Sequence, residues 1–584
     1  MPQRESHSKN NLQQCLLLIC FSIFFFGCPD SRSQQEPPHS NWIEFRSFSY
    51  VGEDSLTHPV NPGPIEYRNP ILAGFYPDPS IVRVADDYYL VNSSFSWYPG
   101  VPIFHSRDLV NWEQIGHVLD RPAQLLLSGL GVSRGIFAPS IRYHDRLYYM
   151  ITTNVDGVGN FYVTAKNPAG PWSNPTVLPE IDGIDPSFFF DDDGKAYIVH
   201  NGVPPDNKPL YSGHRALYLF PFDLNSGKVS GPGKMIVNGG TDLAKKPVWI
   251  EGPHIFKHNG LYYLIAAEGG TSEQHSEVVF RSQSVDGPYE PYPGNPILTQ
   301  RTLSPSRPDP VTSTGHADMV ETQTGDWWAV FLGCESYAGD FYNTGRETFL
   351  LPVHWIDGWP VILEADKAVP RVLPRPNLPA SVPAKLPMTG PFQWTANFSG
   401  SQLPFELNTL RTPTSQWWAL DAHHSALFLQ PRPEDLNSQR DPSLVARRQQ
   451  HTNFSSTVLL RLPKSTQPSD SGIVAFQNET HSFFLGVHLS SRGQTLFLEK
   501  RNGDISQIAS ANLAASAKEV ELKVEGAASR YRFYYRVGKD PWRQLGGDQD
   551  GTVLSTKSAG GFVGTYIGLF ARSSPTPAAG KTPR

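Results

Sequence analysis

The stretch Gly74-Phe75-Tyr76-Pro77-Asp78-Pro79-Ser80 begins a pattern that the chain repeats four more times. In each copy a polar or small residue precedes an apolar strand, and an aromatic-rich second strand follows 11 or 12 residues later. The copies start 47 to 66 residues apart. A repeat of short strands at this period is typical of a β-propeller, in which each copy forms one blade. Five copies therefore predict five blades.

If the five copies superpose, their first positions lie side by side near the mouth of the central channel. These positions hold Asp78, Ala138, Asp185, Glu251 and His316. Three carboxylates that are far apart in the sequence are therefore expected at one place. Like charges held close together in a pocket do not all ionise easily, so the pKa of at least one carboxyl should rise. An acid and a base that coexist at one pH are what cleavage of a glycosidic bond requires.

Each of these residues also has a simpler interpretation. An Asp before a Pro, as at Asp78 and Asp185, often only caps a turn. His316 alone is more often a hydrogen-bonded channel residue than a metal ligand. Glu251 directly follows the apolar stretch Val248-Trp249-Ile250, where a carboxylate has few purely structural roles. Three carboxylates at equivalent positions of the repeat together favour a catalytic or binding site.

Aromatic side chains near the predicted mouth offer flat apolar faces for the C–H surfaces of a sugar. These residues are Phe75, Phe95, Trp97, Tyr98 and Phe137. An acidic run at residues 191–193 resembles a metal site, but a hairpin tip explains it better, because Asp and Gly favour tight turns.

The composition agrees with an all-β protein. A chain of 584 residues is too long for one core, so two or three domains are expected. Pro and Gly are abundant, with 53 and 49 residues, and only 18% of the residues are charged, which suits short strands and tight turns. The formal net charge is −6 and no basic run stands out, which argues against nucleic acid as a partner.

Residues 1–28 are typical of an export signal. Arg4 and Lys9 precede an apolar run, from Cys15 to Phe26, that is short for a membrane span. The run ends at Gly27-Cys28, which is similar to a bacterial lipoprotein cleavage site with a lipid anchor on the cysteine. Ordinary secretion and a retained membrane anchor are the alternatives. We therefore expect an exported protein that is periplasmic, anchored as a lipoprotein, or secreted.

Composition also predicts the remaining domain boundaries. Residues 29–64 are rich in Ser, Gln, Pro and His and predict a flexible linker, and a Pro-rich linker is expected at 371–389. Between them, residues 65–370 contain the five repeats. Residues 390–572 lose the repeat and alternate apolar with polar residues, which predicts a β-sandwich. The tail, 573–584, predicts disorder.

The expected fold is thus all-β, a five-bladed β-propeller followed by a β-sandwich domain. Of the four cysteines, only Cys334 lies in these domains, so no disulfide framework and no cysteine-based metal site are expected. We expect Cys334 to be a small core residue.

Three motifs resemble the signatures of glycoside hydrolase family 43. They are Asn69–Leu72 together with Gly74–Ser80, then Gly183–Ser187, and then Glu251-Gly252-Pro253-His254. The second domain resembles the sandwich appended to the β-xylosidases of that family, through Ser443–Gln450 and Phe562–Leu569.

This resemblance implies an inverting single displacement. It implies Asp78 as the general base, Glu251 as the general acid, and Asp185 as the group that orients Glu251 and tunes its pKa. Arg346 is implied to contact sugar hydroxyls, and His316 matches an axial histidine that binds calcium in some members. No cofactor is required, no metal ligand is assigned, and a structural calcium near His316 is the one metal considered.

The expected substrate-binding residues are Phe95, Trp97, Phe137, Arg346 and His316. Phe137 stands where the family commonly has Trp, so the apolar wall is kept but the indole N–H is lost. This departure leaves the precise substrate open.

We therefore predict an exo-acting β-xylosidase that releases xylose from the non-reducing ends of xylo-oligosaccharides. The sandwich is expected to press against the propeller and narrow the mouth of the channel. α-L-Arabinofuranosidase activity on arabinose-containing glycans, alone or combined, is the close alternative, because the two sugars present their hydroxyls similarly. A non-catalytic sugar-binding propeller and a retaining fructosidase-type propeller are the alternatives from other classes. The sequence does not indicate the oligomeric state.

Overall fold

The computed structural model describes residues 41–53, 60–304, 306–462, 467–491 and 493–574. The predicted signal segment 1–28 with Cys28, residues 29–40 and 54–59 of the predicted linker, and residues 575–584 of the predicted tail lie outside these described residues. Within the described part of the chain, no helix is long and apolar enough to cross a membrane.

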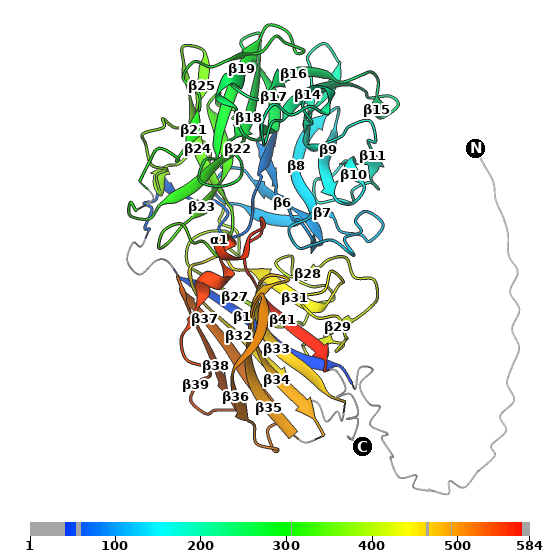
Figure 1. Cartoon of the computed structure of the whole chain (residues 1–584), viewed down its shortest axis with the longest axis vertical. Helices are drawn as coiled ribbons and strands as arrows, with labels where there is room; N and C mark the ends of the chain where they lie inside the picture. Colours follow the sequence, from blue (N-terminus) through cyan, green and yellow to red (C-terminus); the bar gives the residue numbers. More distant parts are fainter. Residues whose placement is uncertain (1–40, 54–59, 305, 463–466, 492, 575–584) are drawn as a thin grey trace, which may run out of the picture. The chain divides into compact units, whose positions relative to one another are not determined.

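Five antiparallel sheets, each built from strands that follow one another in the chain, form the blades of a propeller (Figure 1). This confirms the predicted five blades. Blade one contains β3 (Ser80–Val84), β4 (Asp87–Val91), β6 (Gly100–Ser106) and β7 (Glu113–Leu119), and blade two contains β8 (Gly135–His144), β9 (Leu147–Val155), β10 (Gly159–Ala165) and β11 (Thr176–Val177). Blade three contains β12 (Ile184–Phe190), β13 (Ala196–Gly202), β14 (Ala216–Asp223), β15 (Lys228–Val229) and β16 (Lys234–Asn238). Blade four contains β17 (Glu251–His258), β18 (Leu261–Glu268), β19 (Ser276–Ser282), β20 (Glu290–Pro291) and β21 (Leu298–Thr299), and blade five contains β22 (Val311–Glu321), β23 (Trp327–Glu335), β24 (Glu347–Ile356) and β25 (Trp359–Val361).

The first strands of the blades depart from a regular ladder at the predicted channel positions. Register shifts occur in β8, β12, β17 and β22. A β-bulge takes a residue out of the ladder and re-aims its side chain. The backbone φ angle is positive at Asp78, Ala138, Asp185 and His316, and in blade four at Gly252, directly after Glu251. The local backbone therefore turns the first position of each repeat out of its own blade, which is what a side chain in the channel requires.

The segments before blade one and after blade five pair with each other. β2 (Glu66–Arg68) is antiparallel to β26 (Val372–Pro374). The predicted Pro-rich linker at 371–389 is thus wrong at both ends, because its start is a paired strand and Met388 is buried in a propeller core. Cys334 is buried in β23 without a disulfide, as expected for a core residue.

Two sheets form the sandwich. The first has the order β29 (Trp418–Asp421), β30 (Ala426–Leu429), β1 (Ile43–Glu53), β32 (Asn453–Arg461), β37 (Glu519–Ala527), β38 (Arg530–Arg536) and β39 (Arg543–Gln544), with β27 (Phe392–Ala396) on β1 and β40 (Gln549–Asp550) on β38. The second has the order β36 (Asp504–Asn512), β35 (Gly493–Asn502), β34 (His481–Ser490), β33 (Ser469–Asn478), β41 (Tyr566–Ser573), β31 (Ser443–Arg448), β28 (Asn408–Leu410) and β5 (Trp97–Tyr98). Short helical turns are found at η1 (Pro205–Asn207), η2 (Leu243–Lys245), η3 (Gly551–Leu554) and α1 (Thr556–Ala559).

β1 corrects the predicted flexible linker at 29–64. Its residues Ile43–Glu53 form a long strand that pairs with β27, β30 and β32, and Figure 1 shows this strand in blue among the sandwich strands. Ile43, Phe45, Phe48 and Tyr50 are buried in the sandwich core. These apolar side chains supply the burial that a polar tether lacks, and the Ser- and Pro-rich composition of the surrounding stretch concealed them.

The propeller and the sandwich are joined by backbone and side-chain contacts. β5, in the segment between β4 and β6 of blade one, pairs with β28 of the sandwich. Trp97 stacks on Tyr566 with ring centroids 3.6 Å apart, and Arg448 donates to the Phe75 carbonyl at 2.7 Å. The two folds therefore share a sheet and a buried interface.

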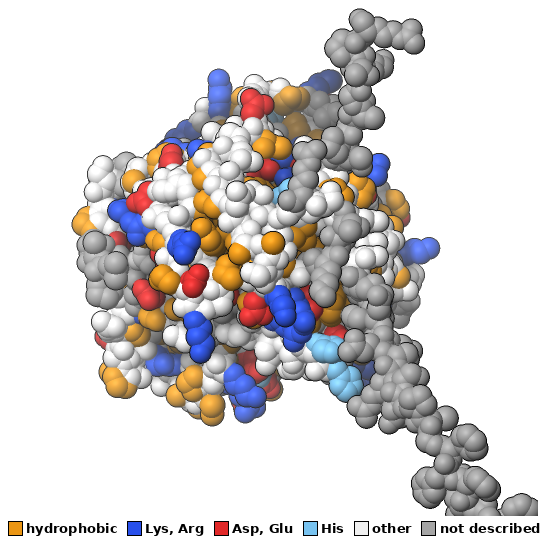
Figure 2. Space-filling model, turned by 90° about the horizontal axis from the view of Figure 1, so that it is seen from below, with side chains coloured by type: hydrophobic (Ala, Val, Ile, Leu, Met, Phe, Trp, Pro, Cys, Tyr) orange, Lys and Arg blue, Asp and Glu red, His pale blue; other side chains and the backbone are white. Residues whose placement is uncertain are grey.

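On the face shown in Figure 2, basic and acidic side chains are interspersed among hydrophobic and uncharged ones. No continuous basic area forms on that face, in keeping with the net charge of −6.

Candidate active site

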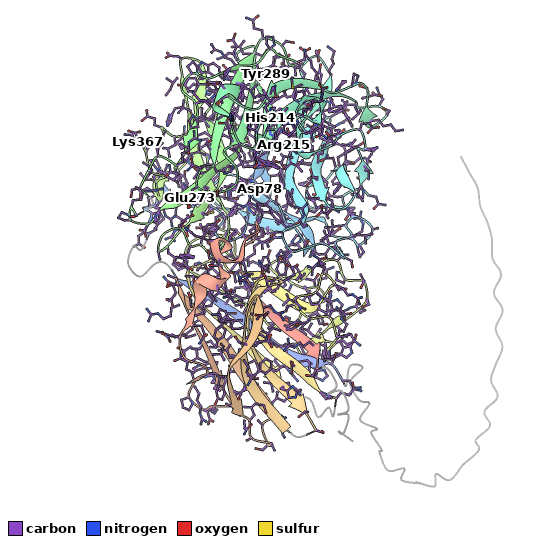
Figure 3. All side chains as sticks on the ribbon, viewed as in Figure 1. Asp78, His214, Arg215, Glu273, Tyr289 and Lys367 are labelled. Atoms are coloured by element: carbon purple, nitrogen blue, oxygen red, sulfur yellow. The ribbon has the colours of Figure 1, made fainter. Side chains whose placement is uncertain are left out.

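The five first positions of the repeats meet at one cavity. Asp78, Ala138, Asp185, Glu251 and His316 all line a hollow of about 430 Å³. Figure 3 labels Asp78 among the propeller strands. This size lies in the range of small-molecule sites in proteins. The structure therefore brings together the three carboxylates that the repeat pattern aligned.

Asp78 is buried but has cationic and hydrogen-bonding partners. Its Oδ1 accepts from Nη1 of Arg346 at 2.8 Å, and its Oδ2 accepts from the Ser93 hydroxyl at 2.6 Å. The Nδ1 atom of His316 lies 3.9 Å from Oδ1. Burial raises the pKa of Asp78, but Arg346, His316 and Ser93 more than offset it, so the pKa lies below its ordinary value. Asp78 is therefore an ionised carboxylate, suited to accept a proton.

Glu251 has the opposite electrostatic environment. It begins β17 and is buried in the cavity wall. Burial raises its pKa, the negative charges of Asp185 and Asp78 raise it further, and the pKa lies well above its ordinary value. The raised pKa favours the protonated form of Glu251, which suits this carboxyl to donate a proton.

Asp185 is the third buried carboxyl of the cavity, and it contacts the strand that carries Glu251. Its Oδ2 accepts from the backbone N–H of Gly252 at 3.1 Å. Burial and the charge of Asp78 raise the pKa of Asp185 to about 6, although His316 and the Gly252 N–H oppose the shift. Gly252 has a φ of 57°, and a Cβ there would lie 2.8 Å from Nε2 of His316, so glycine is required. Asp185 thus fixes the backbone beside Glu251 and raises its pKa.

Three phenylalanine rings form one wall of the cavity. The centroids of Phe95 and Phe137 lie 4.8 Å apart, and the ring of Phe562 lies 6.1 Å from Phe95 and 6.0 Å from Phe137. The Arg346 guanidinium lies 5.6 Å from the centroid of Phe95 and 5.9 Å from that of Phe562. Because Phe562 belongs to the sandwich domain, the second domain contributes a side chain to the cavity.

The lining also includes Trp249, which the sequence does not single out as a site residue. The Arg215 guanidinium lies 4.7 Å from the Trp249 ring, and Arg215 donates to Oδ1 of Asn201 at 2.8 and 3.0 Å. Phe562, Arg134 and Thr271 also line the cavity without having been predicted to do so. Trp249 directly precedes Ile250-Glu251, and this position is a signal from which its role could be predicted. Arg134 and Thr271 lie in loops without a motif.

Of the predicted substrate-binding residues, Phe95, Phe137, Arg346 and His316 line the cavity. The prediction for Trp97 is wrong, because its side chain is fully buried between the two domains against Tyr566 and Phe476. Phe75 is likewise buried beside Tyr566, and Tyr98 lines a separate hollow with Phe405 and Trp418. These aromatics belong to the domain interface, where flat rings also pack well.

The acidic run at 191–193 occupies the turn between β12 and β13, as its hairpin interpretation requires. Asp191 accepts from Nζ of Lys257 at 3.1 Å and from the Tyr262 hydroxyl at 2.7 Å. These contacts give the run a structural role at the end of the blade.

The calcium considered near His316 does not fit the protein groups around it. Calcium takes six to eight oxygen ligands. Near His316 the Asp78 carboxylate is already engaged by Arg346 and Ser93, and the described residues contain no cluster of three or more His, Cys, Asp or Glu side chains that would hold a metal. No step below uses a metal.

Both domains of the chain match known protein families. Residues 67–360 match the family described as Glycosyl hydrolases family 43, and residues 395–582 match the Beta xylosidase C-terminal Concanavalin A-like domain. A xylosidase/arabinosidase from Butyrivibrio fibrisolvens is 40% identical over 518 residues, which cover 87% of this chain and 96% of that protein. A non-reducing end alpha-L-arabinofuranosidase from Bacteroides ovatus is 34% identical over 86% of this chain and 91% of its own length.

Among solved structures, a family 43 protein retrieved from a capybara gut metagenome has a TM-score of 0.84 and 39% identity, covering 91% of this chain and 99% of its own. The two family matches and the similarity to these relatives cover both the propeller and the sandwich. The chain therefore belongs to glycosyl hydrolases family 43 and is an inverting glycoside hydrolase.

Proposed function

We propose that this hydrolase is an exo-acting β-xylosidase that removes xylose from the non-reducing ends of xylo-oligosaccharides. The observation that carries the proposal is the opposite shift of two pKa values in one cavity, low for Asp78 and high for Glu251. Glycosidic cleavage by inversion needs such a pair, one carboxylate and one carboxylic acid.

In the proposed mechanism, Glu251 donates its proton to the oxygen of the leaving sugar. Asp78 accepts a proton from a water molecule, which attacks the anomeric carbon from the opposite face. The carboxyls of an inverting pair are usually about 6.5–9.5 Å apart, which leaves room for that water. Arg346 lowers the pKa of Asp78, which favours the carboxylate that accepts a proton, whereas burial and then Asp185 raise the pKa of Glu251, which favours the acid that donates one.

The exo mode is supported by the wall that the sandwich adds. Phe562 packs against Phe95 and Phe137, and its N–H donates to the Ser133 hydroxyl at 3.0 Å. A cavity walled by both domains accepts the end of a chain more readily than its middle. Phe95 and Phe137 supply apolar faces for the terminal sugar, and Arg346 supplies donors for its hydroxyls.

α-L-Arabinofuranosidase activity is the second candidate. The name of the Butyrivibrio relative includes both activities, and the Bacteroides relative is named for the arabinofuranosidase alone. A xylopyranose and an arabinofuranose are isomeric pentoses, so one cavity of this size can receive either. The proposed xylosidase therefore has a defined competitor that kinetics can decide.

The test compares kcat/KM on 4-nitrophenyl β-D-xylopyranoside and 4-nitrophenyl α-L-arabinofuranoside, with xylotriose as the natural-type substrate. We expect the xyloside to be preferred and xylotriose to lose one xylose at a time from its non-reducing end. A strong preference for the arabinofuranoside overturns the xylosidase proposal in favour of the second candidate. Release of xylobiose from the interior of longer chains overturns the exo mode. The Asp78→Asn variant, which lacks the proposed base and is expected to lose activity on every substrate, is the control for contaminating activity.

We also propose that the protein is exported, on the basis of the signal-like residues 1–28, and that Cys28 carries a lipid. Expression of the full chain with cell fractionation and labelled palmitate tests both points. Incorporation of label that disappears in Cys28→Ser supports the anchor, whereas an exported but unlabelled protein supports ordinary secretion. Retention of the full-length protein in the cytoplasm contradicts export.

A further inference from the structure

Next to the carboxylates, a second set of polar side chains crosses the channel on the same inner strands. Ser80 lies two residues after Asp78, His254 three residues after Glu251, and Asp318 two residues after His316. All three side chains are buried. Arg142, in the inner strand of blade two, is the residue that contacts all three. We call Ser80, Arg142, His254 and Asp318 the channel clasp.

Arg142 binds Asp318 with both ends of its guanidinium. Nη1 lies 2.8 Å from Oδ2 and Nη2 lies 3.1 Å from Oδ1 of Asp318. Oδ2 of Asp318 also accepts from the Ser80 hydroxyl at 2.7 Å and from the Ile81 N–H at 3.0 Å. Bidentate pairs of arginine and carboxylate are both strong and directional. The clasp therefore defines the separation of the inner strands of blades one, two and five.

The same guanidinium reaches blade four. Nη2 of Arg142 lies 2.9 Å from Nδ1 of His254. A guanidinium has donors only, so Nδ1 must be the acceptor and the imidazole must be neutral. Burial lowers the pKa of His254 to about 3, with Arg142 adding to the effect and Asp318 opposing it. His254 therefore stays an acceptor over the neutral pH range.

Other hydrogen bonds between inner strands join two neighbouring blades, such as the bond from the Ile141 N–H to the Ser80 hydroxyl at 3.1 Å and the bond from the Ser187 hydroxyl to the Pro253 carbonyl at 2.6 Å. Blades one, two, four and five belong to four separate hydrogen-bonded sheets. β2 and β26 tie the ends of the propeller outside the blades. Within the described residues, a single side chain, that of Arg142, thus connects the inner strands of four blades, including the two that carry Asp78 and Glu251.

We propose that Arg142 is a positioning residue of this hydrolase, which holds the strands of Asp78 and Glu251 at the separation that the inverting reaction needs. The proposal rests on the roles proposed above for these two carboxyls. A displacement of about 1 Å in catalytic geometry can lower the rate about a hundredfold. Loss of the clasp should therefore lower turnover even in a protein that remains folded.

A purely stabilising role for Arg142 leads to a different expectation. Breaking a buried ion pair destabilises a protein, but it changes turnover only if the reacting groups move. The sandwich supplies a matched control in Arg572, which also contacts three side chains, here the carboxylates of Asp435, Asp470 and Glu499, at 3.1, 2.9 and 2.8 Å. Its side chain is 16% exposed, against 17% for Arg142.

The first experiment compares Arg142→Lys with Arg572→Lys. Lysine keeps the charge but cannot bind two oxygens and an imidazole in a planar fork. Below the unfolding transition of both variants, we expect kcat of Arg142→Lys to fall about ten- to a hundredfold with KM changed less than about threefold. Arg572→Lys should lower the unfolding temperature and keep kcat within about twofold of the wild type. An Arg142→Lys protein with wild-type kcat, whatever its unfolding temperature, overturns the proposal.

A second pair of variants covers the case in which Arg142→Lys does not fold. His254→Leu removes the acceptor from the strand of Glu251 and leaves the Arg142–Asp318 pair in place, whereas His254→Asn keeps an acceptor near the position of Nδ1. We expect His254→Leu to lose more activity on xylobiose than on the nitrophenyl xyloside, because a displaced acid matters most for a poor leaving group. His254→Asn should restore most of that loss. Equal losses on both substrates, or no rescue by asparagine, contradict the positioning role.

These outcomes stay separate from those for the proposed function. If Glu251→Gln is fully active, the assignment of the acid is wrong whatever the clasp variants do. If Glu251→Gln is inactive while the clasp variants turn over normally, the assignment stands and the clasp proposal fails.

Discussion

The two sides of the cavity hold the same chemical group in opposite states. On the side of blade one, Asp78 is paired with Arg346 and bonded to Ser93, and its pKa is low. On the side of blades three and four, burial and then the charges of Asp185 and Asp78 raise the pKa of Glu251, the opposing effect of Arg346 is smaller than these, and that pKa is high. Burial is nearly complete on both sides and pushes both pKa values upward.

Burial alone therefore does not explain why the pKa of Asp78 is low and the pKa of Glu251 is high. The difference comes mainly from Arg346, which is paired with Asp78, with smaller contributions from His316 and Ser93. Arg346 immediately precedes β24, so blade five supplies the charge that distinguishes blade one from blade four. A ring of blades allows this, because its first and last members are neighbours.

The largest effect is expected when one of the two carboxyls, Asp78 or Glu251, is replaced by an amide. Asp78→Asn deletes the proposed base, and we expect kcat to fall about a thousandfold or more on every substrate. Glu251→Gln deletes the proposed acid, and we expect a fall of about a hundred- to ten-thousandfold on xylobiose but a smaller one on the nitrophenyl xyloside, whose leaving group needs little protonation. Steady-state kinetics on the two substrates check both. Similar losses for Glu251→Gln on the two substrates would contradict its role as the acid.

The next largest effect is a rise in the pKa of Asp78, toward the raised pKa of Glu251. Arg346→Met removes the positive charge that lowers the pKa of Asp78, so that pKa rises and the acidic limb of the kcat/KM profile moves to higher pH. Arg134→Met is a matched control, because Arg134 also lines the cavity but pairs with Asp156. An acidic limb that stays in place in Arg346→Met, or that moves equally in Arg134→Met, would show that another charge holds Asp78 ionised.

A third effect is a fall in the pKa of Glu251, toward the lowered pKa of Asp78. Asp185→Asn removes a negative charge that raises the pKa of Glu251, so that pKa falls and the alkaline limb of the profile moves to lower pH. We also expect kcat to fall, because the hydrogen bond to the Gly252 N–H is weakened. Asp182→Asn, at an exposed aspartate three residues earlier, should leave the alkaline limb unchanged. A shift of the alkaline limb to higher pH in Asp185→Asn would contradict the assignment.

How far the sequence predicts this site follows from the symmetry of the repeat. Asp78, Asp185, Glu251 and His316 were placed together because equivalent positions of a propeller converge, and the structure places all four on one cavity. The local backbone supports this, with positive φ angles at three of them and at Gly252 beside the fourth. A residue whose position is set by the repeat is therefore predictable from the sequence alone.

Residues set by the contact between domains were not predictable in this way. Trp97 and Phe95 are close in sequence and chemically alike, yet one packs against Tyr566 and the other lines the cavity. Composition predicts a linker over Ile43–Glu53, because the strand partners of this segment come from residues 392–461 and are not visible in the local sequence. Phe562 was seen only as part of a sandwich motif. In each case the deciding partner is hundreds of residues away and outside any repeat.

The smallest expected effect tests whether the sandwich domain contributes to the cavity through Phe562, near Arg346 and Asp78. Phe562 packs near Arg346, and its carbonyl lies 3.5 Å from Nη2. Phe562→Ala opens that wall to water, which screens the attraction between Arg346 and Asp78. We expect KM for xylobiose to rise about three- to tenfold, since the apolar contact is lost, and the acidic limb to move slightly to higher pH.

Phe405→Ala is the matched control, because Phe405 is a half-exposed phenylalanine of the same domain that lines the separate hollow beside Tyr98. It should leave both KM and the acidic limb at wild-type values. If Phe562→Ala behaves like this control, the sandwich does not contribute to the cavity in solution. The difference between the pKa values of Asp78 and Glu251 then arises within the propeller, from Arg346, His316 and Ser93. If instead KM rises without any movement of the acidic limb, Phe562 holds the sugar but does not shield the ion pair.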